Sequence, residues 1–96
     1  MSYDTFAMTE HIETLINNGN IQEAIEALDA AIDNSPAKND RLFYLRGNAY
    51  RKSGDWKKAL DNYLEAIDIN PDSPAKEAYR MAMDIMEFYN KDMFNQ

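Results

Sequence analysis

Few residues in this chain could perform acid–base or metal chemistry, and they are scattered. The 96-residue sequence holds one histidine, His11, and no cysteine. One histidine without thiols cannot form a two-histidine or Cys-zinc site, a disulfide or a thiol nucleophile. A general base needs a partner in a pocket, and no serine lies at helical spacing from His11. We therefore interpret His11 as structural and predict that the protein is not an enzyme and binds no cofactor or metal.

The sequence also contains no motif for binding calcium or phosphate. The nearest match to a calcium loop, residues 68–72, lacks both the glycine and the downstream glutamate. The three glycines are isolated and cannot form a phosphate loop. The 17 acidic residues are spread through the chain, which is typical of a solvated surface.

The distribution of charged residues along the chain is more informative than these motifs. Between Lys38 and Lys58 seven basic residues face two acidic ones, so this segment carries +5 and the remainder −12 of a net −7. Within it, a donor-rich set recurs at steps of three, four, three and one, which places its members on one helix face, apart from Phe43, Gly47 and Tyr50. The set consists of Arg41, Tyr44, Asn48, Arg51 and Lys52. Such a face suits an acidic or carboxylate-bearing peptide; the alternative is a solvated face that balances acidic neighbours.

The helices that carry these residues are delimited by glycine and proline breaks. Gly19 and Gly54 lie 35 residues apart, and so do Pro36 and Pro71. The same step relates six pairs of apolar residues, from Ile21 and Trp56 to Ile32 and Ile67, which indicates an internal repeat. Apolar periodicity predicts helices near 5–18, 21–33, 40–53, 56–69 and 74–90, followed by a tail over 91–96.

Helix start and stop signals agree with these bounds. Gly19 and Gly54 suit the left-handed residue after a helix. Asp55 can cap the helix that follows it, Ser73 with Pro74 can open the fifth helix, and Asn20 with Glu23 forms a capping-box-like start.

Residues 40–73 resemble the tetratricopeptide repeat. The pattern appears as Phe43-x-x-Arg46-Gly47-x-x-Tyr50, then Ala59-x-x-x-Tyr63, then Ala66 and Pro71. Arg46 differs from the family pattern, because the family prefers leucine at this position. Residues 5–39 resemble a degenerate copy in which Ile12 replaces the small glycine.

The resemblance implies an all-α fold for a small stand-alone protein of the bacterial type. Residues 1–96 would form one domain, a right-handed solenoid of helical hairpins (an α-α superhelix). It would contain a degenerate repeat over 5–39, a well-matched repeat over 40–73, a capping helix over 74–90 and the tail. Gly47 would mark a close approach of the third and fourth helices.

The family also implies a non-catalytic protein-interaction module. Its first helices line a concave groove, so the face of Arg41, Tyr44, Asn48, Arg51 and Lys52 would bind a peptide there. Members that clamp a chaperone's C-terminal carboxylate use lysine, asparagine and arginine at positions where this chain has other residues, such as Thr9, Leu45 and Tyr79. We therefore expect a different protein or peptide partner, such as an acidic peptide.

The fifth helix offers a second interaction candidate. We expect its apolar stripe to be buried on the second hairpin, with the tail folded back over Phe88. The stripe consists of Ala78, Met81, Ala82, Ile85, Met86 and Tyr89. Alternatively this methionine- and aromatic-rich end, which also includes Met83, Met93 and Phe94, is an exposed patch for self-association. The protein would then be a structural subunit that assembles through its solenoid ends, so we expect a monomer or a weak homodimer.

Composition limits the location and the partners. No stretch reaches the ~20 apolar residues that span a membrane, and the first residues lack the basic start and apolar run of a secretory signal. We expect a cytoplasmic protein. The net charge of −7 argues against nucleic-acid and anionic-membrane binding.

Overall fold

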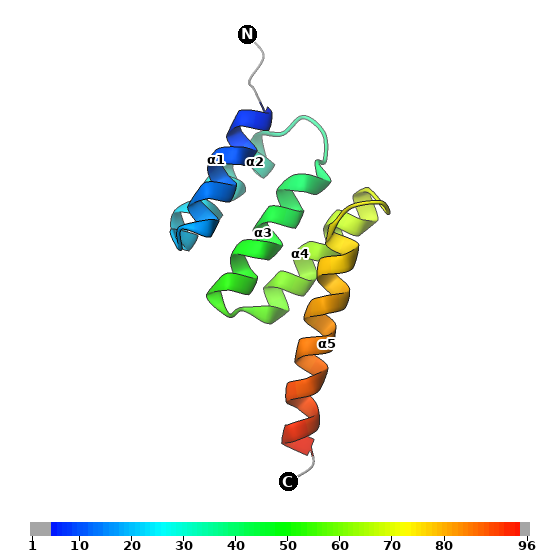
Figure 1. Ribbon diagram of the computed structural model, residues 1–96. Helices are drawn as coiled ribbons and strands as arrows, with labels where there is room; N and C mark the ends of the chain where they lie inside the picture. The colour runs from blue at the N-terminus through cyan, green and yellow to red at the C-terminus, as the bar shows by residue number, and fades with distance from the viewer. Residues whose placement is uncertain (1–4, 95–96) are drawn as a thin grey trace.

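In the part of the chain that the structure describes, five α-helices follow one another and form a solenoid of helical hairpins. The structure, a computed structural model, describes residues 5–94, with side chains described from Phe6 to Tyr89. Over that range the chain is all-α. The helices are α1 (Thr5–Asn17), α2 (Ile21–Asn34), α3 (Asp40–Ser53), α4 (Trp56–Ile69) and α5 (Ala75–Phe94). In Figure 1, α1, α3 and α5 lie on the near side, with α2 and α4 behind them. The first helices of the hairpins therefore share one side of the solenoid.

The two glycine turns join the helices of each hairpin. Gly19 and Gly54 have φ values of 85° and 89°, a backbone region that glycine adopts without steric cost. The amide of Asn20 donates to the Leu15 carbonyl at 2.8 Å, and that of Asp55 donates to the Tyr50 carbonyl at 2.9 Å. These bonds satisfy carbonyls at the ends of α1 and α3, as the sequence predicts.

Two of the three predicted caps are confirmed. The Asp55 carboxylate accepts from the Lys58 amide at 3.1 Å, and the Ser73 hydroxyl accepts from the Ala75 amide at 3.1 Å. The predicted capping box at Asn20 and Glu23 is wrong. Asn20 has φ −83° and ψ 63°, and its side chain makes no cap hydrogen bond. Its backbone carbonyl instead accepts from the Ala24 amide at 3.0 Å.

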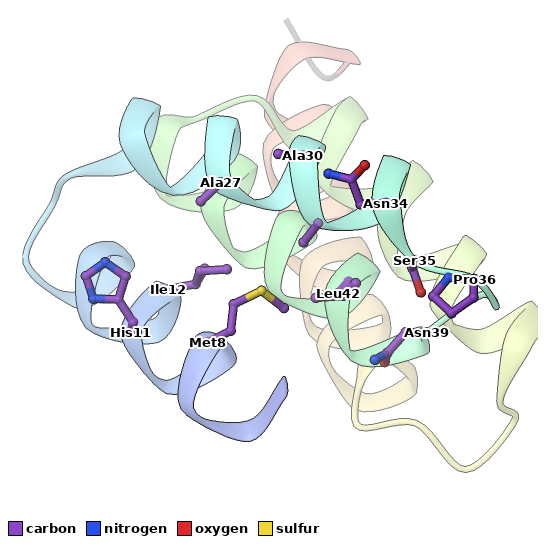
Figure 2. A pocket seen from close by; sticks show the side chains of 11 residues that line it. Met8, His11, Ile12, Ala27, Ala30, Asn34, Ser35, Pro36, Asn39 and Leu42 are labelled. Atoms are coloured by element: carbon purple, nitrogen blue, oxygen red, sulfur yellow. The ribbon is translucent and has the colours of Figure 1, made fainter. Parts of the chain in front are cut away.

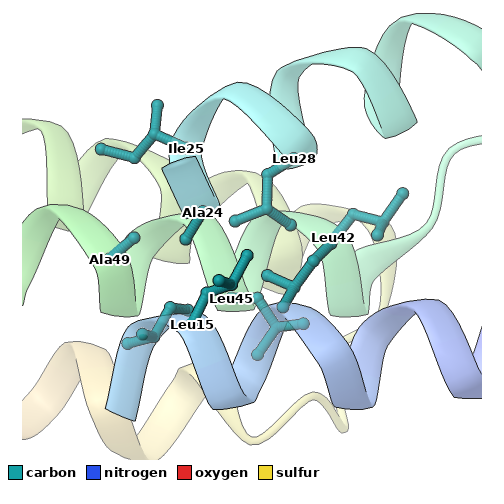
Figure 3. Packing of buried hydrophobic residues seen from close by; sticks show 9 residues of the cluster. Leu15, Ala24, Ile25, Leu28, Leu42, Leu45 and Ala49 are labelled. Carbon is teal, nitrogen blue, oxygen red and sulfur yellow. The ribbon is translucent and has the colours of Figure 1, made fainter. Parts of the chain in front are cut away.

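The core consists of two clusters joined by α3. The first lies between α1, α2 and one face of α3, where Leu28 and Leu45 are buried (Figure 3). The second lies between α4, α5 and the opposite face of α3, around the fully buried Tyr63. Because α3 contributes to both, its exposed side chains, such as Arg41, Arg51 and Lys52, lie on its remaining face.

The predicted close approach at Gly47 is confirmed. A Cβ atom added there would lie 2.6 Å from two ring carbons of Tyr63 and 3.2 Å from the Ala59 carbonyl oxygen. Only glycine allows α3 and α4 to pack at this separation.

The predictions for α5 need two corrections. Residues 91–94 continue the helix, so the expected tail over 91–96 is wrong there; residues 95 and 96, like the side chains of Met93 and Phe94, lie outside the described part. The stripe is also not buried throughout. Ala82 is buried, but Met81, Ile85 and Tyr89 are 54%, 39% and 61% exposed. Phe88, which lies outside the stripe, is 64% exposed.

The physical reason is length. Helix α5 has 20 residues and α4 has 14, and the second half of α5 extends past the turn between α3 and α4 (Figure 1). The first half caps the second hairpin, whereas no described segment folds back over Phe88.

Candidate functional site

The donor-rich face of α3 is organised by a side chain from α4, Tyr63. Its hydroxyl donates to Asn48 Oδ1 at 2.5 Å and accepts from Arg51 Nε at 3.3 Å. The Tyr44 ring lies 6.3 Å from the Tyr63 ring, centroid to centroid. The structure thus brings Tyr44, Asn48 and Arg51 together around one buried phenol.

Arg41 and Lys52 lie at opposite ends of this face. Arg41 Nη2 is paired with Glu13 Oε1 of α1 at 2.7 Å, so part of its charge is already neutralised. Lys52 is exposed and forms no hydrogen bond or ion pair with the part of the chain that the structure describes. We call these five residues, Arg41, Tyr44, Asn48, Arg51 and Lys52, the α3 face.

Burial keeps the Tyr63 hydroxyl protonated. Burial raises the pKa of Tyr63, because a phenolate is poorly solvated inside the protein, while the hydrogen bond and charge of Arg51 act in the opposite direction. With the Asn48 oxygen and the Arg51 Nε engaged by Tyr63, the Asn48 amide nitrogen and the terminal Arg51 nitrogens face no partner among residues 6–89. The face therefore offers pre-oriented donors.

Sequence reasoning missed the role of Arg46, although its departure from the family pattern was a signal. Arg46 Nε donates to Asn62 Oδ1 at 2.7 Å, and Nη1 pairs with Asp29 Oδ1 of α2 at 2.8 Å. Its guanidinium carbon lies 5.3 Å from the centre of the Phe43 ring. Arg46 thus fills the space between α3 and α4 and ties the second hairpin to the first.

Sequence reasoning also missed a pocket of about 540 Å³ between α1 and α2 (Figure 2). His11, which the sequence suggested was structural, is exposed at its edge. Among the described residues, no group of three or more His, Cys, Asp or Glu side chains could hold a metal ion. The signal for the pocket was Ile12 in place of the repeat's glycine, facing the alanines of α2.

Comparisons with known proteins agree with this architecture. The family model described as tetratricopeptide repeat matches residues 9–74. The chain is similar to a Bacteroides fragilis protein whose structure was solved in solution by NMR, with 55% identity and a TM-score of 0.81. The match covers 91% of this chain and 88% of that chain. Over the described range, every helix is too short or too polar to cross a membrane.

Proposed function

The chain belongs to the tetratricopeptide repeat family, and from this premise we propose that its α3 face binds a peptide segment of a partner protein. Tetratricopeptide repeats generally mediate protein–protein interaction and are non-catalytic. The proposal is that this chain is an adaptor or scaffold. Its peptide would carry acidic side chains or a free carboxylate.

The observation that carries the proposal is the fixation of donors by Tyr63. Asn48 and Arg51 are held by one buried hydroxyl, so little side-chain entropy is lost when a carboxylate binds them. Arg51 keeps its two terminal nitrogens for a bidentate carboxylate contact, and Lys52 adds an exposed charge beside it.

A selection experiment tests this proposal. Peptides that bind the wild-type protein are selected from a random display library and titrated against two variants. Arg51→Glu should weaken binding at least tenfold, mainly through a slower association rate. Lys57→Glu is the matched control, because Lys57 is exposed on α4 and, among the described residues, pairs with Asp61 alone. Selected peptides without acidic groups, or equal affinity for Arg51→Glu and wild type, would place the site elsewhere.

A second candidate function is self-assembly through α5. Met81, Ile85 and Phe88 follow one another at steps of four and three, and all three are exposed, which is the spacing of a helix-pairing seam. Two copies would then associate through this stripe. Solution mass measured at two protein concentrations separates the two candidate functions. A mass that rises with concentration indicates self-association by mass action, whereas a monomer at both concentrations favours peptide binding.

A further inference from the structure

The space between α1 and α2 is open, whereas the side chains of Phe43, Arg46 and Asn62 occupy the matching space between α3 and α4. The floor of the open space is apolar, formed by Met8 and Ile12 of α1 and by Ala27, Ala30 and Ala31 of α2. Polar side chains stand at the edge: His11, Asn34 and Asn39 (Figure 2). A volume of about 540 Å³ lies within the usual range of ligand sites, roughly 300–1,000 Å³.

The second hairpin shows what fills the equivalent space. The 35-residue step relates Met8 to Phe43, His11 to Arg46 and Ala27 to Asn62. There the Arg46 guanidinium lies 5.3 Å from the centre of the Phe43 ring and bonds Asn62 at 2.7 Å. The second hairpin thus holds a flat aromatic and guanidinium stack where the first has a thioether, an imidazole turned to the edge, and a methyl group.

The first hairpin is wider as well as less filled, since α1 and α2 approach each other less closely than α3 and α4 do. Gly47, which lets Tyr63 approach within 2.6 Å of its Cβ position, is replaced by the buried Ile12. The branched side chain holds α1 away from α2. The pocket is therefore a result of specific replacements at several matching positions.

We propose that this pocket binds an aromatic side chain, tryptophan or tyrosine, of a partner protein. The ring would occupy the place that the Phe43 and Arg46 stack occupies in the second hairpin, against the methyl groups of α2. Its N–H or O–H would meet the edge, where the side chains of His11 and Asn34 make no hydrogen bond with residues 6–89. The Asn39 side chain is engaged by the Arg41 amide at 2.9 Å. The site is separate from the α3 face and does not depend on it.

N-acetyl-tryptophanamide and N-acetyl-tyrosinamide are suitable probes, with N-acetyl-leucinamide as the aliphatic control. Amide ¹H–¹⁵N spectra of the full chain are recorded during titration. We expect saturable shifts confined to the amides of the pocket residues, with a dissociation constant on the order of millimolar, as for fragments of this size. The aliphatic probe should bind at least fivefold more weakly.

Two variants that fill the pocket decide the assignment. The triple variant Met8→Phe, His11→Arg, Ala27→Asn transplants the stack of the second hairpin, and Ala27→Leu fills the floor with one change. In both variants the probe-induced shifts of the pocket amides should be at least tenfold smaller. The melting temperature of both should stay the same or rise. Arg51→Ala is the control and should retain the shifts of the pocket amides. A failure of the pocket proposal can therefore be distinguished from a failure of the proposal that the α3 face binds a peptide.

Three results would overturn the proposal: no shifts at the pocket amides with either aromatic probe, equal shifts with the leucine probe, or shifts that persist in both filled variants.

Discussion

At the scale of single residues, Tyr63 joins the packing of the second hairpin to the chemistry of its surface. Its ring occupies the space that a Cβ at position 47 would need. Its hydroxyl holds Asn48 and Arg51 of the α3 face. A change that displaces this ring should therefore alter both stability and binding.

Gly47→Leu should lower the free energy of unfolding by about 1–3 kcal/mol, because the new side chain overlaps the Tyr63 ring. Urea denaturation measures the change. Lys52→Leu, on the exposed face of the same helix, is the control and should stay within about 0.5 kcal/mol of wild type. A Gly47→Leu protein more stable than wild type would contradict the close approach of α3 and α4.

Tyr63 should make the protein sensitive to alkaline pH. Because burial raises the pKa of Tyr63 above its usual 10.0, the unfolded chain releases this proton first as pH rises. The contribution of Tyr63 to stability is thus full below about pH 10 and is lost as pH rises through the folded pKa.

Unfolding measured between pH 8 and pH 11.5 checks this. Tyr63→Phe should show a smaller loss of stability over that range than wild type, although it starts from a lower value. Tyr89→Phe removes an exposed phenol and should follow wild type. Parallel pH profiles for Tyr63→Phe and wild type would show that the buried phenol does not titrate with unfolding.

At the scale of elements, α5 has two unequal halves. Its first half buries Ala75 and Ala82 against the Tyr63 cluster. Its second half presents Ile85, Phe88 and Tyr89 to solvent. The stabilising part of α5 therefore ends near Met83.

Two truncations should separate these halves. Within the range 84–89, Met86 is the one side chain that is half-buried. Deleting residues 84–96 should therefore lower the free energy of unfolding by about 1 kcal/mol. Deleting residues 74–96 uncovers Tyr63 and Ala66 and should leave a chain without a cooperative transition. Circular dichroism melting curves measure both. A 1–73 chain that melts close to the full-length temperature would show that α5 is not a cap.

The helices and the hairpin pairing could be predicted from sequence, because glycine, proline and apolar periodicity act locally and are repeated at one step. The residues of the α3 face could be proposed from helical spacing, whereas their fixation by Tyr63 depends on how two helices approach. The pocket and the exposed half of α5 were not predictable in the same way. Both depend on spaces between elements, and Ile12 alone does not tell how far α1 moves from α2.

At the scale of the whole molecule, charge is separated along the chain. The segment from Lys38 to Lys58 carries +5 and the remainder −12. Two copies, each with net charge −7, repel one another over long range, whereas an acidic peptide is attracted locally to the α3 face.

Salt should therefore affect the two candidate functions in opposite directions. Raising ionic strength from 0.05 to 0.5 M shortens the screening length from above 10 Å at low salt to a few Å. Peptide binding at the α3 face should weaken, and self-association through α5 should strengthen. Titration calorimetry and sedimentation measure the two effects. Peptide binding that is unchanged by salt would show that charge attraction does not drive binding at the α3 face.

The unequal width of the two hairpins has a consequence for local unfolding. Helix α1 packs beside a pocket of about 540 Å³, while α3 and α4 enclose Tyr63 without space for one methyl group. Segments with fewer buried contacts open at lower free energy than the global transition. Native-state hydrogen exchange should thus show the amides of α1 exchanging through a subglobal opening, and those of α3 and α4 only through complete unfolding. Helix α1 would act as the labile foldon of the chain, and an aromatic ligand that fills the pocket beside it would slow exchange in α1 without changing it in α3 and α4.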